Sequence, residues 1–91
     1  MTVKKEKMFG VLFREKPALM LIALKNSKNA KYASSLAKEV DCTYSHVIKL
    51  LQEMETAALV RFNKTGRLKL LELTKKGEDI ADYIQFIKNS F

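Results

Sequence analysis

Residues 36–60 decide how this chain folds, and they read LAKEVDCTYSHVIKLLQEMETAALV. The first part, through Val40, has the apolar spacing of a short amphipathic helix. A tight turn at residues 41–43 follows, and a longer amphipathic helix is predicted over residues 44–57. Thr43 is a favourable N-cap, because its hydroxyl can accept a hydrogen bond from a free backbone N–H of the first turn. This order predicts a helix-turn-helix, whose second helix is shaped to enter the major groove of DNA.

The predicted second helix has two contrasting faces. At about 100° per residue, one face collects apolar residues that should pack on the rest of the domain. These are Val47, Leu50, Leu51, Met54 and Ala58. The opposite face and the N-terminal end predict contacts to DNA through Thr43, Tyr44, Ser45, His46, Lys49 and Gln52. Gln52 suits adenine and Lys49 suits guanine or phosphate, although an ordinary solvated helix face has the same residue types.

The rest of the chain completes one domain over residues 1–91, a length that leaves no room for a second independent core. The fold class predicted is mainly α with a small β-hairpin, a winged helix-turn-helix. Residues 1–8 are expected to be a flexible basic N-terminus. The other predicted elements are a short helix at 9–13, a buried helix at 18–24, a very short strand at 30–32, a helix at 34–40, a hairpin at 60–73 and a last helix at 75–89.

The net charge of +7 is unevenly distributed along the chain. Residues 1–31 carry +6 and residues 60–76 carry +5, whereas residues 32–59, which hold the helix-turn-helix, carry −2. Nucleic-acid-binding surfaces are basic, so most of the affinity is expected from the N-terminal lysines and the hairpin. The hairpin, or wing, over residues 61–69 is predicted to contact the DNA backbone or minor groove through Arg61, Lys64, Thr65, Arg67 and Lys69.

The last predicted helix has an apolar stripe longer than the domain can cover. Packing onto the domain can account for Ile80, Tyr83 and Ile84. Ile87 and Phe91 extend the stripe by a further turn, where a body this small has little surface left. An uncovered apolar stripe indicates a partner surface. A homodimer is therefore predicted, with its interface formed by Ile84, Ile87 and Phe91, and the apolar cluster from Phe9 to Phe13 is left open as a further part of it.

Several other classes of protein are not expected. The sequence has no Gly-rich phosphate loop, no plausible catalytic carboxylate pair and no Cys/His constellation, so an enzyme is improbable. Cys42 is the single cysteine, which excludes an internal disulfide, and it is expected to pack as a small apolar residue. His46 lacks partners at metal-ligand spacing, so neither a metal nor another cofactor is predicted. No apolar segment has the length of a membrane span, no effector pocket is evident, and a cytoplasmic location is expected.

Short motifs follow one another in a recognisable order. They are Leu36-Ala37-x-x-Val40, Thr43-x-Ser45-x-Val47, Leu51-x-x-Met54-x-x-x-x-Leu59-Val60, Gly66-Arg67 and Leu73-Thr74-x-x-Gly77. In this order and spacing, over roughly residues 17–84, they resemble the MarR/ArsR-type winged-helix transcriptional regulators. The small size and high lysine content are similar to those of small archaeal or viral regulators.

The resemblance implies how such a chain would work. It implies a dimer whose residues Tyr44, Ser45, His46 and Lys49 read the major groove, while Lys64 and Arg67 reach the minor groove or backbone. Two positions depart from the glycines that the family places in its turns, and they are Asp41 and Ala58. Asp tolerates a left-handed backbone. Ala58 must either avoid a positive φ or be strained.

The function these features favour is sequence-specific binding to double-stranded DNA as a transcriptional regulator. Two alternatives stay open. One is a winged helix that serves as a protein–protein interaction module of a larger assembly, which the −2 charge of residues 32–59 supports. The other is an architectural protein that binds DNA regardless of sequence, which the isoelectric point of 9.6 supports.

Overall fold

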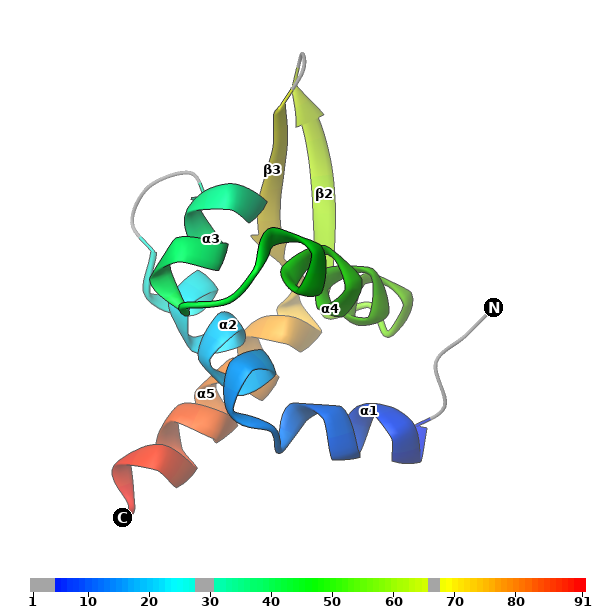
Figure 1. Ribbon diagram of the computed structural model, residues 1–91. Helices are drawn as coiled ribbons and strands as arrows, with labels where there is room; N and C mark the ends of the chain where they lie inside the picture. The colour runs from blue at the N-terminus through cyan, green and yellow to red at the C-terminus, as the bar shows by residue number, and fades with distance from the viewer. Residues whose placement is uncertain (1–4, 28–30, 66–67) are drawn as a thin grey trace.

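The computed structural model describes residues 5–27, 31–65 and 68–91 (Figure 1). In chain order the elements are α1 (Lys5–Leu12), α2 (Glu15–Asn26), β1 (Lys31–Tyr32), α3 (Ala33–Glu39), α4 (Tyr44–Thr56), β2 (Val60–Thr65), β3 (Leu68–Leu73) and α5 (Lys75–Asn89). The predicted fold class is confirmed, since helices α2, α3 and α4 are followed by a hairpin and a C-terminal helix. The chain is a winged helix-turn-helix.

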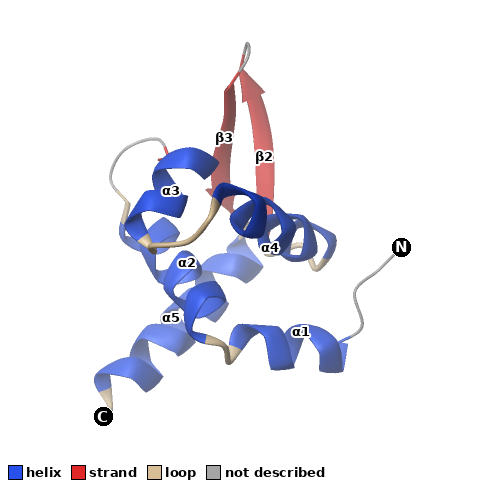
Figure 2. Ribbon diagram, in the orientation of Figure 1, coloured by secondary structure: helices blue, strands red, loops and turns tan. Residues whose placement is uncertain are grey.

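The three strands form one antiparallel sheet in the order β1-β3-β2. β2 and β3 pair from Val60 opposite Leu73 to Thr65 opposite Leu68, and this hairpin is the wing. β1 pairs with β3 only through Lys31 and Tyr32, which connects the start of α3 to the wing. Figure 2 shows the wing as the long β element of an otherwise helical molecule. The short strand predicted at residues 30–32 is confirmed for the part that is described.

α2 lies at the centre of the core. Its apolar residues surround the helix, so it can pack against neighbours on several sides. Pro17 is buried in its first turn, where a missing backbone N–H is tolerated, and residues 20–24 are buried after it. Helices α1, α3 and α5 and strand β3 all contact α2. The buried helix predicted at 18–24 is confirmed, and it extends further at both ends.

The N-terminal helix α1 begins earlier than predicted. Residues 1–8 are expected from sequence to be flexible, yet α1 begins at Lys5 and Met8 is buried. Met8 and Val11 are three residues apart, so they lie on one face of α1, and both belong to the hydrophobic core. The structure therefore differs from the prediction at residues 5–8, where a mostly polar stretch forms the first turn of α1 and ends in the core residue Met8. Residues 1–4 lie outside the described part.

α5 packs on the domain through small residues more than through its large ones. Gly77 and Ala81, one turn apart, are both buried, and Ile80 and Ile84 are half-buried against the core. Tyr83, which domain packing could have covered, is 66% exposed. A side chain at position 77 would place its Cβ 1.9 Å from the carbonyl oxygen of Leu59, so only glycine lets α5 start so close to the backbone of Leu59.

The two ends of the molecule differ in kind (Figure 1). The wing projects at one end, and α1 and the C-terminal half of α5 lie at the other. α4 lies between them, with its flank toward the viewer. Among the described helices, none has the length and apolar character that crossing a bilayer requires.

Candidate nucleic-acid interface

The turn between α3 and α4 fixes the direction of α4. Asp41 has a φ of 55°, and the N–H of Cys42 donates to the carbonyl of Ala37 at 2.9 Å. This pairing closes α3 in the way that usually requires glycine in the left-handed position, and Asp is among the few residues that tolerate it. The ammonium of Lys16 on α2 donates to the carbonyl of Val40 at 2.7 Å. The turn is therefore held from both α3 and α2.

Thr43 starts α4 as the sequence predicts. Its backbone is extended and its hydroxyl oxygen accepts from the backbone N–H of His46 at 3.2 Å. A cap of this kind satisfies one of the free donors at a helix N-terminus. Because Thr43 is the cap, Tyr44, Ser45 and His46 form the first turn of α4, and all of them are exposed.

The two predicted faces of α4 are present. Val47, Leu50, Leu51 and Met54 are buried in the core. The predicted DNA-contacting residues are all exposed, and they are Thr43, Tyr44, Ser45, His46, Lys49 and Gln52. Their placement brings hydrogen-bond donors and acceptors together on one free helix surface, as base recognition in a groove requires. Cys42 is half-buried and packs against the core, as expected for a small apolar residue.

The end of α4 corrects one prediction. The sequence places Ala58 on the buried face, but α4 ends at Thr56, and Ala58 is exposed with a φ of 64°. The N–H of Leu59 donates to the carbonyl of Met54 at 2.8 Å, which closes the helix around a left-handed Ala58. Ala58 therefore has the positive φ that strains an alanine, because the chain must turn sharply to enter β2.

The wing is basic, but part of its charge is already engaged. Arg61 Nε lies 3.2 Å from a carboxylate oxygen of Glu72 on the paired strand, and the amide of Asn63 donates to the other oxygen at 3.4 Å. The side chains of Lys64, Thr65 and Lys69, and Arg67 altogether, lie outside the described part. The wing residues predicted to touch DNA therefore stay a prediction.

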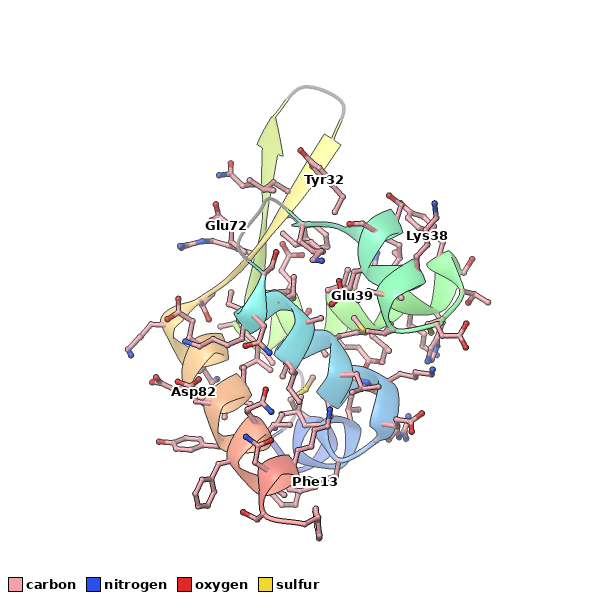
Figure 3. The ribbon with its side chains drawn as sticks, turned by 90° about the vertical axis from the view of Figure 1, so that its left-hand side faces the viewer. Phe13, Tyr32, Lys38, Glu39, Glu72 and Asp82 are labelled. Atoms are coloured by element: carbon pink, nitrogen blue, oxygen red, sulfur yellow. The ribbon has the colours of Figure 1, made fainter. Side chains whose placement is uncertain are left out.

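A second exposed surface, rich in large apolar side chains, lies at the end of the molecule away from the wing. We call it the apolar surface, and its exposed large residues are Phe9, Phe13, Tyr83, Phe86, Ile87 and Phe91. The rings of Phe9 and Phe13 lie 4.7 Å apart, centroid to centroid. Between α1, α2 and α5 all of these residues except Phe86 line a groove, together with Ile80 and Ile84. Figure 3 shows Phe13 at the same end as the C-terminal turns of α5.

Sequence reasoning found only part of the apolar surface. It named Ile84, Ile87 and Phe91 and left residues 9–13 open as a further part; Ile84 is half-buried, Phe91 is fully exposed, and Phe9 and Phe13 are exposed. Phe86 was missed, although it is 73% exposed, because it lies off the stripe of the other apolar residues of α5.

Two residues named as DNA contacts, His46 and Lys49, line a second groove on the flank of α4. No cluster of ligands that could hold a metal ion occurs in the described ranges.

The fold and the exposed face of α4 together define a winged helix-turn-helix of the type found in MarR-family transcriptional regulators. No protein-family model matches the sequence. The chain belongs to the same family as an uncharacterized protein of Archaeoglobus fulgidus, to which it is 31% identical over 80 residues. That alignment covers 85% of this chain and 84% of the relative.

Solved structures of other proteins share the fold of this chain. The crystal structure of AF1382 from Archaeoglobus fulgidus is 29% identical, with a TM-score of 0.81 over 90% of this chain and 93% of that one. MepR, a transcription regulator of the Staphylococcus aureus multidrug efflux pump MepA, is 20% identical with a TM-score of 0.79. This chain is covered to 93% and MepR to 64%. A MepR variant bound to an oligodeoxyribonucleotide is 19% identical, with a TM-score of 0.78.

Proposed function

We propose that this protein is a transcriptional regulator that binds a specific site in double-stranded DNA. The observation that carries the proposal is the exposed polar face of α4 within a complete helix-turn-helix that is followed by a wing. A helix presented in this way fits the major groove. The MepR variant that shares this fold is bound to an oligodeoxyribonucleotide, which supports the same use of the fold here.

The first two turns of α4, with Thr43 before them and Gln52 just after them, are assigned the reading of bases. Gln52 pairs well with adenine and Lys49 with guanine, while Ser45 and Thr43 accept several partners. Glu53 is half-buried and Glu55 is exposed beyond these residues. Carboxylates repel backbone phosphates, so the C-terminal half of α4 is assigned a position away from the strands.

The wing is assigned most of the contact to the DNA backbone. The segment from Val60 to Lys76 carries +5, whereas residues 32–59 carry −2, so the helix-turn-helix alone has the wrong charge for tight binding. Lys64 and Arg67 near the hairpin turn are assigned to the phosphates or the minor groove, together with Arg61, Thr65 and Lys69. The basic N-terminal segment adds to this affinity.

A second copy of the chain is assigned to the apolar surface. Its large side chains lie together on α1 and α5, at the end of the molecule away from the wing, so a partner there leaves α4 and the wing free. Closed two-fold dimers are the commonest oligomers of soluble proteins. A two-fold dimer places two α4 helices about 34 Å apart, on successive major grooves of a roughly palindromic site.

Selection of bound fragments from sheared genomic DNA tests the proposal. The full chain is mixed with the fragments at about 50 mM and at about 200 mM salt, and bound fragments are sequenced. A shared sequence that survives competition with nonspecific DNA is expected. Recovery of random fragments would mean architectural binding. A complete absence of binding at the lower salt would contradict DNA binding altogether.

Two sets of variants then test how the work is divided. Gln52→Ala and Lys49→Ala should change which bases are preferred, because they remove contacts to base edges. The double variant Lys64→Ala/Arg67→Ala should weaken all duplexes alike and reduce the slope of log affinity against log salt by about 1.8. Equal, sequence-independent losses in both sets would contradict this division.

A further inference from the structure

The basic side chains of the described part fall into two groups. Most are held by partners within the chain, through ion pairs or bonds to carbonyl oxygens, and these are Lys16, Lys25, Lys31, Arg61, Lys75 and Lys76. Among the basic side chains that the structure describes, which leaves out those of Lys5, Lys7, Lys64 and Lys69, four have neither an ion pair nor a side-chain hydrogen bond, and they are Arg14, Lys38, Lys49 and Lys88. Those four are available to an anion from outside.

Two of these four cations line the same groove. Arg14, at the start of α2, and Lys49, on the second turn of α4, both line a groove between α1 and the flank of α4. His46 and Leu50 of α4 and Gly10 and Val11 of α1 complete it, together with Glu53. The groove therefore adjoins the same two turns of α4 that are assigned to base reading.

Gly10 is a second and independent sign that something approaches this groove. It lies inside α1, where glycine weakens a helix relative to alanine. Apart from the neighbouring residues and the backbone of α1 itself, no atom of the described chain lies within 4 Å of the place where its Cβ would be. The fold itself thus gives no packing reason for glycine. A bare backbone beside two available cations leaves room for a bulky anion to come close.

We propose that this groove holds a backbone phosphate of the DNA strand that borders the major groove occupied by α4. This inference rests on the proposed DNA binding and adds a contact outside the helix-turn-helix and the wing. The planar guanidinium of Arg14 can donate two hydrogen bonds to phosphate oxygens, and Lys49 adds a point charge. The ring N–H of His46 is a further donor.

Glu53 is the group that opposes a phosphate here. It lies four residues after Lys49, and the two side chains do not form an ion pair within 4.0 Å. An unneutralised carboxylate at the wall repels the phosphate, so the groove binds less tightly than its two cations would allow. Glu53 therefore supplies a test of opposite sign, since its removal should strengthen binding.

The main experiment measures Arg14→Ala by fluorescence anisotropy on the tightest duplex from the genomic selection. The side chain of Arg14 makes no cap hydrogen bond to α2, so its removal should leave the fold intact. Loss of one phosphate contact should reduce the slope of log affinity against log salt by about 0.9. The loss of affinity should therefore be about 3.5-fold larger at about 50 mM than at about 200 mM salt.

Lys75→Ala is the matched control. It removes the same unit of charge from the first turn of α5, where Lys75 donates to Asp79 at 3.0 Å. That hydrogen bond raises the pKa of Lys75 above its ordinary value, so the control side chain is fully charged in the wild type. If Arg14→Ala and Lys75→Ala change the salt slope equally, the loss reflects net charge, and the groove is not a phosphate site.

Two further variants test the groove itself. A Cβ at position 10 meets open space, so Gly10→Leu should fold, leave thermal unfolding unchanged or raised, and lower DNA affinity severalfold. Glu53→Gln should raise affinity severalfold, because it removes the repelling carboxylate. An unchanged affinity in both variants would overturn the proposed site.

The position on the DNA is tested with duplexes that carry a neutral methylphosphonate in place of a single phosphate. At one position in each half-site, the substitution should weaken the wild type but not Arg14→Ala, because that phosphate has already lost its partner. If every position weakens both proteins equally, Arg14 does not contact a phosphate. If the wild type binds no duplex at low salt, the proposed function fails first, and the groove inference fails with it.

Discussion

Helices α4 and α5 are built alike and differ in what they expose. Each begins after a threonine whose hydroxyl oxygen accepts from the N–H three residues on, Thr43 from His46 and Thr74 from Gly77. Each lays one face on the same core. The exposed residues of α4 are mainly polar, whereas α5 also exposes large apolar or aromatic side chains, as Tyr83 and Phe86 illustrate.

The difference shows what each helix is free to meet. A polar face with donors and acceptors stays hydrated until a ligand with matching groups replaces the water, as base edges in a groove do. The exposure of an aromatic face to water is unfavourable in free energy, so the protein is stabilised when another apolar surface covers that face. One winged helix thus has two outward surfaces, one suited to nucleic acid and one suited to protein.

The largest effect is expected from a charge placed on the apolar surface. Ile87→Glu should dissociate the proposed dimer, because a carboxylate buried at the interface would lack a partner. Since two linked binding events become separate ones, DNA affinity should fall by about 10³-fold. Sedimentation equilibrium and fluorescence anisotropy measure the two quantities on the same samples.

The control for Ile87→Glu is Asn89→Glu, which adds the same charge to an exposed polar position of α5. It should leave both mass and affinity unchanged. A wild-type protein that is monomeric at micromolar concentration would contradict the assignment of the apolar surface to a second copy. In that case the interaction-module alternative would gain support.

The third residues of α4 and α5 differ in how closely they are packed. Gly77→Ala should lower the free energy of unfolding by about 3 kcal/mol, because the new Cβ would lie 1.9 Å from Leu59 O and α5 would have to move. His46→Ala at the equivalent position of α4 should change stability by less than about 0.5 kcal/mol, since His46 is exposed. Urea unfolding compares them directly, and equal losses would refute the close approach of α5 to the backbone of Leu59.

The two caps should also differ in strength. Thr43→Ala should lower the free energy of unfolding by about 1 kcal/mol, through loss of the bond to His46 N–H. Thr74→Ala should lower it by about 2 kcal/mol, because the Thr74 hydroxyl also donates to the carbonyl of Ala58 at 2.6 Å. Thr74→Ser keeps both bonds and should recover most of the loss. Without that recovery, the hydrogen bonds are not the cause.

Much of the fold could be predicted because its signals are local. The caps at Thr43 and Thr74 and the apolar spacing of α4 depend on residues within one or two turns of each other. The core face of α5 could not be predicted in this way. Gly77 and Ala81 carry almost no apolar signal, and the burial of α5 comes from contact with Leu59 and α2, which are distant in the sequence.

The candidate site shows the same division. The exposed residues of α4 follow from the helical repeat, so their placement could be read from the sequence. The meeting of Arg14 with Lys49 could not, because it depends on how α1 and α2 turn against the flank of α4. The engagement of Arg61 by Glu72 likewise depends on the register of β2 and β3, which pairs the two residues across the wing.

The smallest effect is expected at the C-terminal ends of α3 and α4, the two helices of the helix-turn-helix. Each helix is followed by a residue with a positive φ, Asp41 after α3 and Ala58 after α4. Alanine is strained there by about 1–2 kcal/mol, whereas glycine is not. The added chain entropy of a glycine in the unfolded state offsets about 0.5–1 kcal/mol of that relief. Ala58→Gly should therefore raise the free energy of unfolding by about 0.5 kcal/mol. Asp41→Gly should gain almost nothing, since Asp already tolerates a φ of 55°. Urea unfolding of the two variants side by side gives the comparison, and a loss of stability in Ala58→Gly would show that Ala58 is not strained.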